Sequence, residues 1–160
     1  MKRILLLLAL LVPMAARAQL NILSESAPSV TLAKIYTDLN DTRHSLVEVK
    51  SGEWGVYLSA ATTNRFDDRF IFRLGDTPEE AAHTLRDLAG LCRTHEPGSS
   101  LELEMWPGRV CRCSITDRSG RNKGRSALLI FGATGYAGVT MINDNQLRRI
   151  AAMVEKHAGL

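Results

Sequence analysis

Beyond its first twelve residues the sequence has no long apolar run, and this absence excludes a membrane-spanning helix in the rest of the chain. The one run present, Ile4–Val12, has about half the length that a helix needs to cross a bilayer. Lys2 and Arg3 precede it, and the A-x-A site Ala16-Arg17-Ala18 follows it. This order predicts a signal peptide over residues 1–18 that is removed on export. The residue directly after the cleavage site is Gln19 and not a cysteine, so lipid modification is not predicted.

The chain also lacks an excess of one charge once this signal is removed. The full sequence has 20 lysines and arginines and 17 acidic residues, and three of the basic ones lie in residues 1–18. The 17 that remain balance the acidic residues, so composition gives no general reason to expect binding to nucleic acid or an anionic membrane. The sequence predicts a periplasmic or secreted protein without a transmembrane anchor after cleavage. In a eukaryotic secretory pathway, Asn40-Asp41-Thr42 would be a glycosylation acceptor.

Low-complexity tracts, internal repeats and proline-rich or serine-rich linkers are not apparent after residue 29. Removal of 18 of the 160 residues leaves 142, a length that suits one compact domain with its own core. Residues 19–29 are mostly polar and predict a loose lead-in. We therefore expect a single domain over residues 30–160.

Two segments have the periodicity of amphipathic helices. Thr77-Pro78-Glu79-Glu80 is a capping box, in which Glu80 is expected to reach back to the Thr77 N–H. The first helix ends either at Gly90 or one turn later near Arg93. The second begins at Asn143 or Asp144 and ends near Gly159. Their apolar stripes are expected to pack on a sheet: Ala81, Leu85, Leu88 and Ala89 in the first helix, and Leu147, Ile150, Ala151 and Val154 in the second.

Several short segments alternate with a period of two and predict antiparallel strands. They are Ser45–Lys50, Trp54–Ser59, Arg69–Leu74, Leu101–Met105 and Val110–Ile115. Ala127–Phe131 is apolar on both faces and predicts a further strand near the middle of the sheet. The predicted fold is α+β, with one antiparallel sheet of about five to seven strands and two amphipathic helices packed on it. In the hairpin around Trp106-Pro107-Gly108, an odd-numbered loop sets Glu102 opposite Arg112 on the solvent side.

The small cysteine count, three, leaves at least one cysteine unpaired within a monomer. Cys111 and Cys113 point to the same face of a strand and are poorly placed to bond to each other. Cys92 would face them if the first helix runs on to Arg93. A disulfide from Cys92 to Cys111 or Cys113 and a set of three buried thiols are both compatible with the sequence. Four-ligand zinc spacing is missing, so no metal site is predicted.

One motif resembles the strand and glycine turn of dinucleotide-binding, Rossmann-type reductases. Ala127–Phe131 is followed by Gly132-Ala133-Thr134-Gly135-Tyr136-Ala137-Gly138. The resemblance implies a nicotinamide cofactor on a helix N-terminus. The fold needs a helix directly after the glycines and a further strand with an acidic residue. Val139–Ile142 is extended instead, and the last helix uses the rest of the chain, so we expect a glycine-rich connection and no cofactor.

Three weaker candidate sites remain. The basic segment Arg118–Arg125 carries four positive charges and is compatible with either a binding site for an anionic ligand or a solvated hairpin loop. Asp67 and Asp68 are adjacent and point apart, so they form no natural carboxylate pair. Trp54, Tyr57, Trp106 and Tyr136 suggest a sugar-stacking surface, although alternation places Trp54 with Val56 and Leu58 in the core. Two polar segments, Asp41–His44 and Ser59–Asn64, contain no recognisable nucleophile arrangement.

These features predict an exported, non-catalytic module that binds a protein, peptide or glycan through its sheet, an edge strand or loops. The alternative is a small exported hydrolase whose catalytic residues meet only in three dimensions. A pocket lined by carboxylates or histidines would favour the enzyme. An edge-strand surface with exposed apolar area would favour the binding module. No catalytic, cofactor-binding or metal-ligating residue is assigned from the sequence.

Overall fold

The computed structural model describes residues 28–40, 43–61, 69–118, 124–131 and 139–160, and the predicted signal peptide lies outside this part. The α+β class is confirmed, with strands before each of two helices. The described elements are β1 (Val30–Asn40), β2 (Arg43–Gly52), β3 (Gly55–Ala61), β4 (Arg69–Gly75), α2 (Pro78–Thr94), β5 (Ser100–Trp106), β6 (Arg109–Arg118), β7 (Gly124–Phe131), β8 (Val139–Asn143) and α3 (Asp144–Ala158).

The strands divide between two antiparallel sheets, where the sequence predicted one. The first has the order β1-β2-β3-β4 and the second β5-β6-β7-β8, and each is followed in the chain by a helix. The described part of the chain thus runs twice through four strands and a helix, an order that the sequence analysis did not predict.

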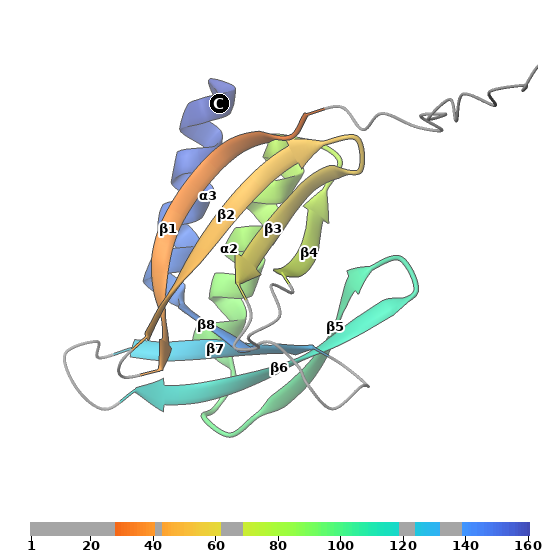
Figure 1. Ribbon diagram of the computed structural model, residues 1–160. Coiled ribbons are helices and arrows are strands. Elements are labelled where there is room, and N and C mark those ends of the chain that lie inside the picture. The colour runs from red at the N-terminus through yellow and green to blue at the C-terminus, as the bar shows by residue number, and fades with distance from the viewer. Residues whose placement is uncertain (1–27, 41–42, 62–68, 119–123, 132–138) are drawn as a thin grey trace, which may run out of the picture.

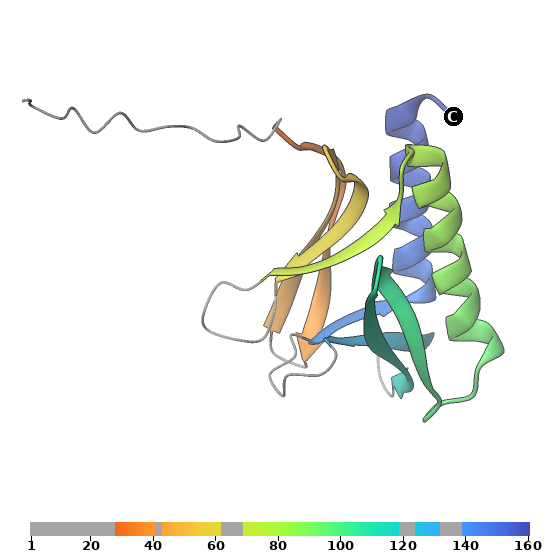
Figure 2. The ribbon, with the colours of Figure 1, turned by 90° about the vertical axis from the view of Figure 1, so that its right-hand side faces the viewer.

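The two helices lie side by side behind the first sheet, and the second sheet crosses near their lower ends (Figures 1 and 2). The helices pack mainly against each other, and among the strands α3 packs mainly against β1 and α2 against β4. One buried core joins both sheets and both helices. Its strand residues alternate as predicted in β4, where Phe70, Phe72 and Leu74 are buried on one face.

Helix ends follow the sequence closely. Thr77 caps α2 by accepting a hydrogen bond from the Glu80 N–H at 3.2 Å. The Glu80 carboxylate reaches back to the Asp76 N–H at 2.7 Å, one residue before the predicted Thr77 N–H. α2 continues through Gly90 to Thr94, the later of the two predicted ends. Asn143 and Gln146 form a complete capping box at the start of α3, and Gly159 ends it in the left-handed conformation.

The β5–β6 register is the predicted one, because Glu102 lies opposite Arg112. The turn itself has only two residues, Pro107 and Gly108, with Trp106 paired to Arg109. A register shift between Glu104 and Trp106 adds the residue that makes the connection odd. Cys111 and Cys113 therefore face the core, and Arg112 stays exposed.

Trp54 corrects the sequence analysis, which placed it in the core with Val56 and Leu58. It lies in the β2–β3 turn, because Gly52 pairs with Gly55, and it is 58% exposed. The two-residue turn ends at Gly55, whose φ of 85° favours glycine. The alternation that buries Val56 and Leu58 begins only after this turn.

Candidate binding groove

β1 is an edge strand of the first sheet. It pairs with β2 on one side, and within the described part of the chain no strand pairs with its other side. β8 approaches β1 near its C-terminal end, while α3 runs along its N-terminal half (Figure 1). The first half of β1 therefore presents its free edge beside a helix.

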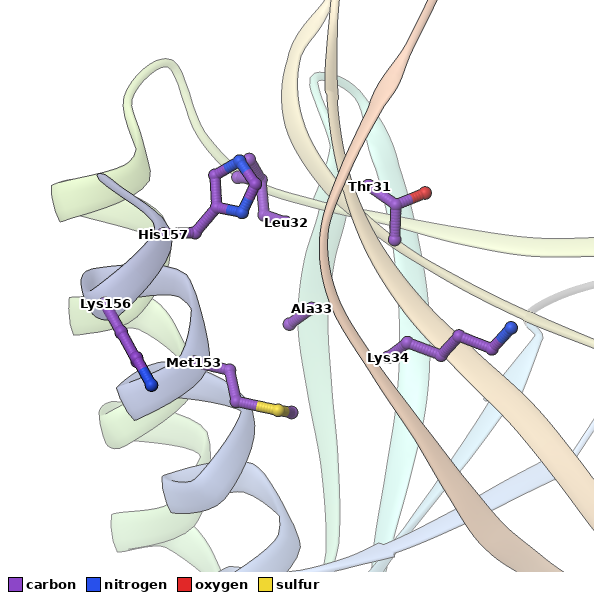
Figure 3. A pocket seen from close by; sticks show the side chains of 7 residues that line it. All are labelled: Thr31, Leu32, Ala33, Lys34, Met153, Lys156 and His157. Carbon is purple, nitrogen blue, oxygen red and sulfur yellow. The ribbon is translucent and has the colours of Figure 1, made fainter. Parts of the chain in front are cut away.

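An open groove of about 480 Å³ lies between this edge and the last turns of α3. Its lining residues are Thr31, Leu32, Ala33 and Lys34 from β1 and Met153, Lys156 and His157 from α3. In Figure 3 the Met153 side chain extends from the helix toward the strand, and Ala33 points toward the helix. Thr31 and Lys34 project to the other side of β1. The groove thus has an apolar floor with polar groups at its rim.

A bulge in β1 shapes the floor. Thr31 pairs with Lys50 and Ala33 with Val49, so Leu32 is an extra residue on β1. A bulge places two successive side chains on one side of a strand. Leu32 and Ala33 both contribute to the core side, Ala33 buried and Leu32 partly buried against it. The free edge at this point is therefore more apolar than strict alternation would allow.

The charges at the groove are positive. Lys34, Lys156 and His157 are exposed, and none of the described lining residues is acidic. Glu48 lies opposite Lys34 in the β1–β2 register, and its carboxylate is 3.3 Å from the Lys50 ammonium. On α3, Glu155 is held by Arg86 of α2. Glu48 and Glu155 thus each have a cationic partner outside the groove lining.

The helical wall is fixed to the neighbouring helix at both ends. Glu155 accepts a hydrogen bond from Arg86 at 2.6 Å, and this contact raises the pKa of the guanidinium. Asp144 accepts one from Arg93 at 2.7 Å. Between these ion pairs, Leu147, Ile150, Ala151 and Val154 are buried as predicted. Met153 and Lys156 are thus carried by a helix that is packed on the core and ion-paired to its neighbour.

The three cysteines form a second cluster, deep in the core. Cys92, Cys111 and Cys113 are buried and in the thiol form in this structure. Burial raises the pKa of Cys113 to about 12, and the neighbouring Cys92 and Cys111 add to this shift. Burial also raises the pKa of Cys111 to about 11. Because α2 runs past Gly90, Cys92 faces the strand cysteines as expected, and a disulfide from Cys92 stays one of the two alternatives that the sequence allows.

The structure brings together two members of the proposed aromatic surface. The Trp54 and Trp106 rings meet edge to face with their centroids 6.1 Å apart. This contact joins the β2–β3 turn to the β5–β6 hairpin. The two ring planes are nearly perpendicular, so the pair does not present one flat surface for stacking. Tyr57 is half-buried on β3, and Tyr136 lies outside the described residues.

Several sequence candidates lie outside the described residues. They include Asp67, Asp68, the glycines of 132–138 and the middle of the basic segment, residues 119–123. The flanking strands are described: β6 ends at Arg118 and β7 begins at Gly124 as an antiparallel partner. β7 and β8 are also antiparallel. This pairing contradicts the parallel βαβ unit that a Rossmann-type cofactor site requires.

Within the part of the chain that the structure describes, no group of three or more histidine, cysteine or acidic residues is arranged to hold a metal ion. No described helix has the length and apolar character needed to span a bilayer. No family model matches this chain, and no curated protein matches it either.

Sequence analysis did not identify the groove residues as a site. Leu32, Met153 and Lys156 belong to different ends of the chain, and only the packing of α3 on β1 brings them together. The available signal was the edge-strand mode of binding, which the sequence predicted without a location. A bulge cannot be located from alternation alone, because one extra residue only shifts the pattern.

Proposed function

We propose that this protein is an exported, non-catalytic module that binds a macromolecular partner, and that the groove between β1 and α3 is its binding surface. The observation that carries the proposal is the free edge of β1 beside an apolar floor of Leu32, Ala33 and Met153. Exposed edges and apolar patches with a polar rim are typical of protein interaction sites.

Export is part of the proposal and rests on the sequence pattern of residues 1–18. In a periplasmic or extracellular setting the partner would be an envelope or extracellular protein, peptide or glycan. The groove contains one histidine and no carboxylate among its described lining residues. That chemistry supports binding over hydrolysis, because hydrolytic sites need an acid, a base or a nucleophile held within reach of each other.

The test is affinity capture from an envelope extract of the native cell with tagged protein beginning at Gln19. Three baits are compared: the wild-type chain, Met153→Asp and Arg148→Glu. Met153 lines the groove, and Arg148 is exposed on another side of the same helix, so the second variant is a matched control. A saturable partner retained by the wild type and by Arg148→Glu but lost by Met153→Asp supports the proposal. A partner retained equally by all three baits contradicts the groove as the binding surface.

Export has a separate test. The amino-terminal sequence of the protein purified from its native cell is expected to begin at Gln19. A chain that keeps Met1–Ala18 and remains inside the cell would contradict export and leave the groove proposal to be judged by capture.

A further inference from the structure

We propose that the occupant of the groove is an acidic peptide in extended conformation, which adds to β1 as a further antiparallel or parallel strand of the first sheet. This inference rests on the proposed function and specifies the chemistry of the partner.

Strand addition is possible because β1 has an edge left unpaired by the described strands, with a helix beside it. An edge strand presents N–H and C=O groups that its sheet leaves unpaired, and an extended peptide can satisfy them. Beside the first half of β1, the last turns of α3 carry Met153 and His157 toward the space next to this edge, and Lys156 lines the groove from the helix itself (Figure 3). A peptide paired with β1 would therefore lie over a helix, as β1 itself does.

The side-chain pattern of the peptide follows from alternation. Successive side chains of a strand point to opposite faces of the sheet. Those on the helix side would contact Ala33 and Met153, which favours apolar residues there. Those on the other side would lie near Lys34, which projects away from the helix in Figure 3. An acidic residue at that position gains a cross-strand pair of opposite charge.

The acidic preference is supported by the rim on the helix side as well. Lys156 and His157 are exposed in the last turns of α3. Arg149 lies seven residues before Lys156, hence on the same side of the helix, and it is also exposed. Positive groups thus flank the groove on both of its walls, with no acidic group among the described lining residues. Complementary charge sets partner choice and association rate.

A bulge and a lysine are also devices by which edge strands avoid pairing with other chains. If these features serve only to block pairing, and if instead they serve to select a partner, the results expected with a peptide are opposite. A protected edge rejects every strand, while a recognition edge accepts an acidic strand and rejects others.

The probe is a fluorescein-labelled peptide of about ten residues that alternates glutamate with valine, a length typical of a strand. Two controls match it: a peptide that alternates lysine with valine, and the glutamate peptide with N-methylated amides at alternate residues. N-methylation removes the donors needed for strand pairing and keeps the charge. Binding is measured by fluorescence anisotropy at low salt, since salt screens exposed charges.

We expect saturable binding of the glutamate peptide and about tenfold weaker binding of both controls, because each control removes one of the two recognition terms. Lys34→Glu and Lys156→Glu are each expected to weaken binding of the glutamate peptide by about fivefold, a rim-charge effect. Arg148→Glu is the matched control, with unchanged binding expected.

Three results overturn the inference. One is the absence of glutamate-peptide binding by a folded wild-type chain. Another is equal binding of the free and N-methylated peptides, which would show a general anion effect. A third is tight binding to phosphatidylglycerol vesicles that the glutamate peptide fails to displace, since the cations would then serve a membrane surface. If capture identifies a partner lost by Met153→Asp while these peptide results fail, the proposed function stands and the acidic-strand inference falls.

Discussion

At the scale of the residue, the cysteine cluster shows how burial controls chemistry. A thiol reacts as its thiolate, and burial disfavours the charged form. Cys113, with its pKa raised to about 12 by burial and by Cys92 and Cys111, is strongly held in the thiol form. The three side chains act as small apolar groups of the core in this state.

Labelling tests this view of the cysteines. We expect the reduced, native protein to resist iodoacetamide near neutral pH, and all three cysteines to react after unfolding with reductant. The same unfolding without reductant decides the predicted disulfide in exported protein. A single label on Cys111 or Cys113 indicates a bridge from Cys92, and three labels contradict it. Rapid labelling of the native chain would contradict the burial of the thiols.

Stability of the reduced protein is expected to fall as the pH rises above about 9, the region where thiols of an unfolded chain ionise. The folded-state pKa values of Cys111 and Cys113 are raised to about 11 and about 12, so only the unfolded chain loses these protons between about pH 9 and pH 11. Each thiol then lowers the free energy of unfolding by at most about 1.4 kcal/mol per pH unit. Urea unfolding at several pH values measures this slope. A Cys113→Ala variant with the same slope as the wild type would contradict the assignment.

At the scale of the element, two glycines have opposite roles. Gly55 ends the β2–β3 turn with φ at 85°, and a Cβ there would lie 2.5 Å from the Gly75 carbonyl oxygen of β4. Gly90 lies inside α2, and a Cβ there would meet no atom within 4 Å. Gly55 is therefore required by its backbone conformation and by the lack of space for a Cβ. Gly90 is required by neither and only lowers the helix propensity of α2.

Alanine substitutions at these two glycines form a matched pair. Gly55→Ala is expected to lower the free energy of unfolding by about 1–3 kcal/mol, because it combines strain with a backbone clash. Gly90→Ala is expected to raise it by about 0.5–1 kcal/mol, because alanine has a higher helix propensity and a less flexible unfolded chain. Thermal or urea unfolding measures both. Equal effects of the two substitutions would contradict the structural distinction.

Elements marked by local chemistry were predictable from the sequence. Thr77 and Asn143 accept hydrogen bonds from the third helical residue, and a cap acts within a few positions of the chain. The Glu102–Arg112 register was predictable for the same reason, since a hairpin is local. The exposed position of Trp54 was not predictable, because it depends on which two residues form the β2–β3 turn, and the alternation of β3 begins only after them.

At the scale of the whole molecule, the division into two sheets and the groove depend on long-range packing. The sequence predicted most of the segments that form strands, but it missed β1 and did not indicate which strands share a sheet. The groove arises because the last helix returns to the first strand, two segments separated by most of the chain. No local pattern around Leu32 or Met153 records that contact. The cationic rim is likewise distributed between Lys34 and Lys156.

Strand addition at the β1 edge is tested most directly by amide chemical-shift mapping. ¹⁵N-labelled protein beginning at Gln19 is titrated with the glutamate–valine peptide and its N-methylated control. The largest shifts are expected at Thr31–Lys34 and Met153–His157, with protection of β1 amides from hydrogen exchange in the complex. Shifts concentrated at Trp54 and Trp106, or an unchanged β1 under saturating peptide, would contradict the groove as the site of binding.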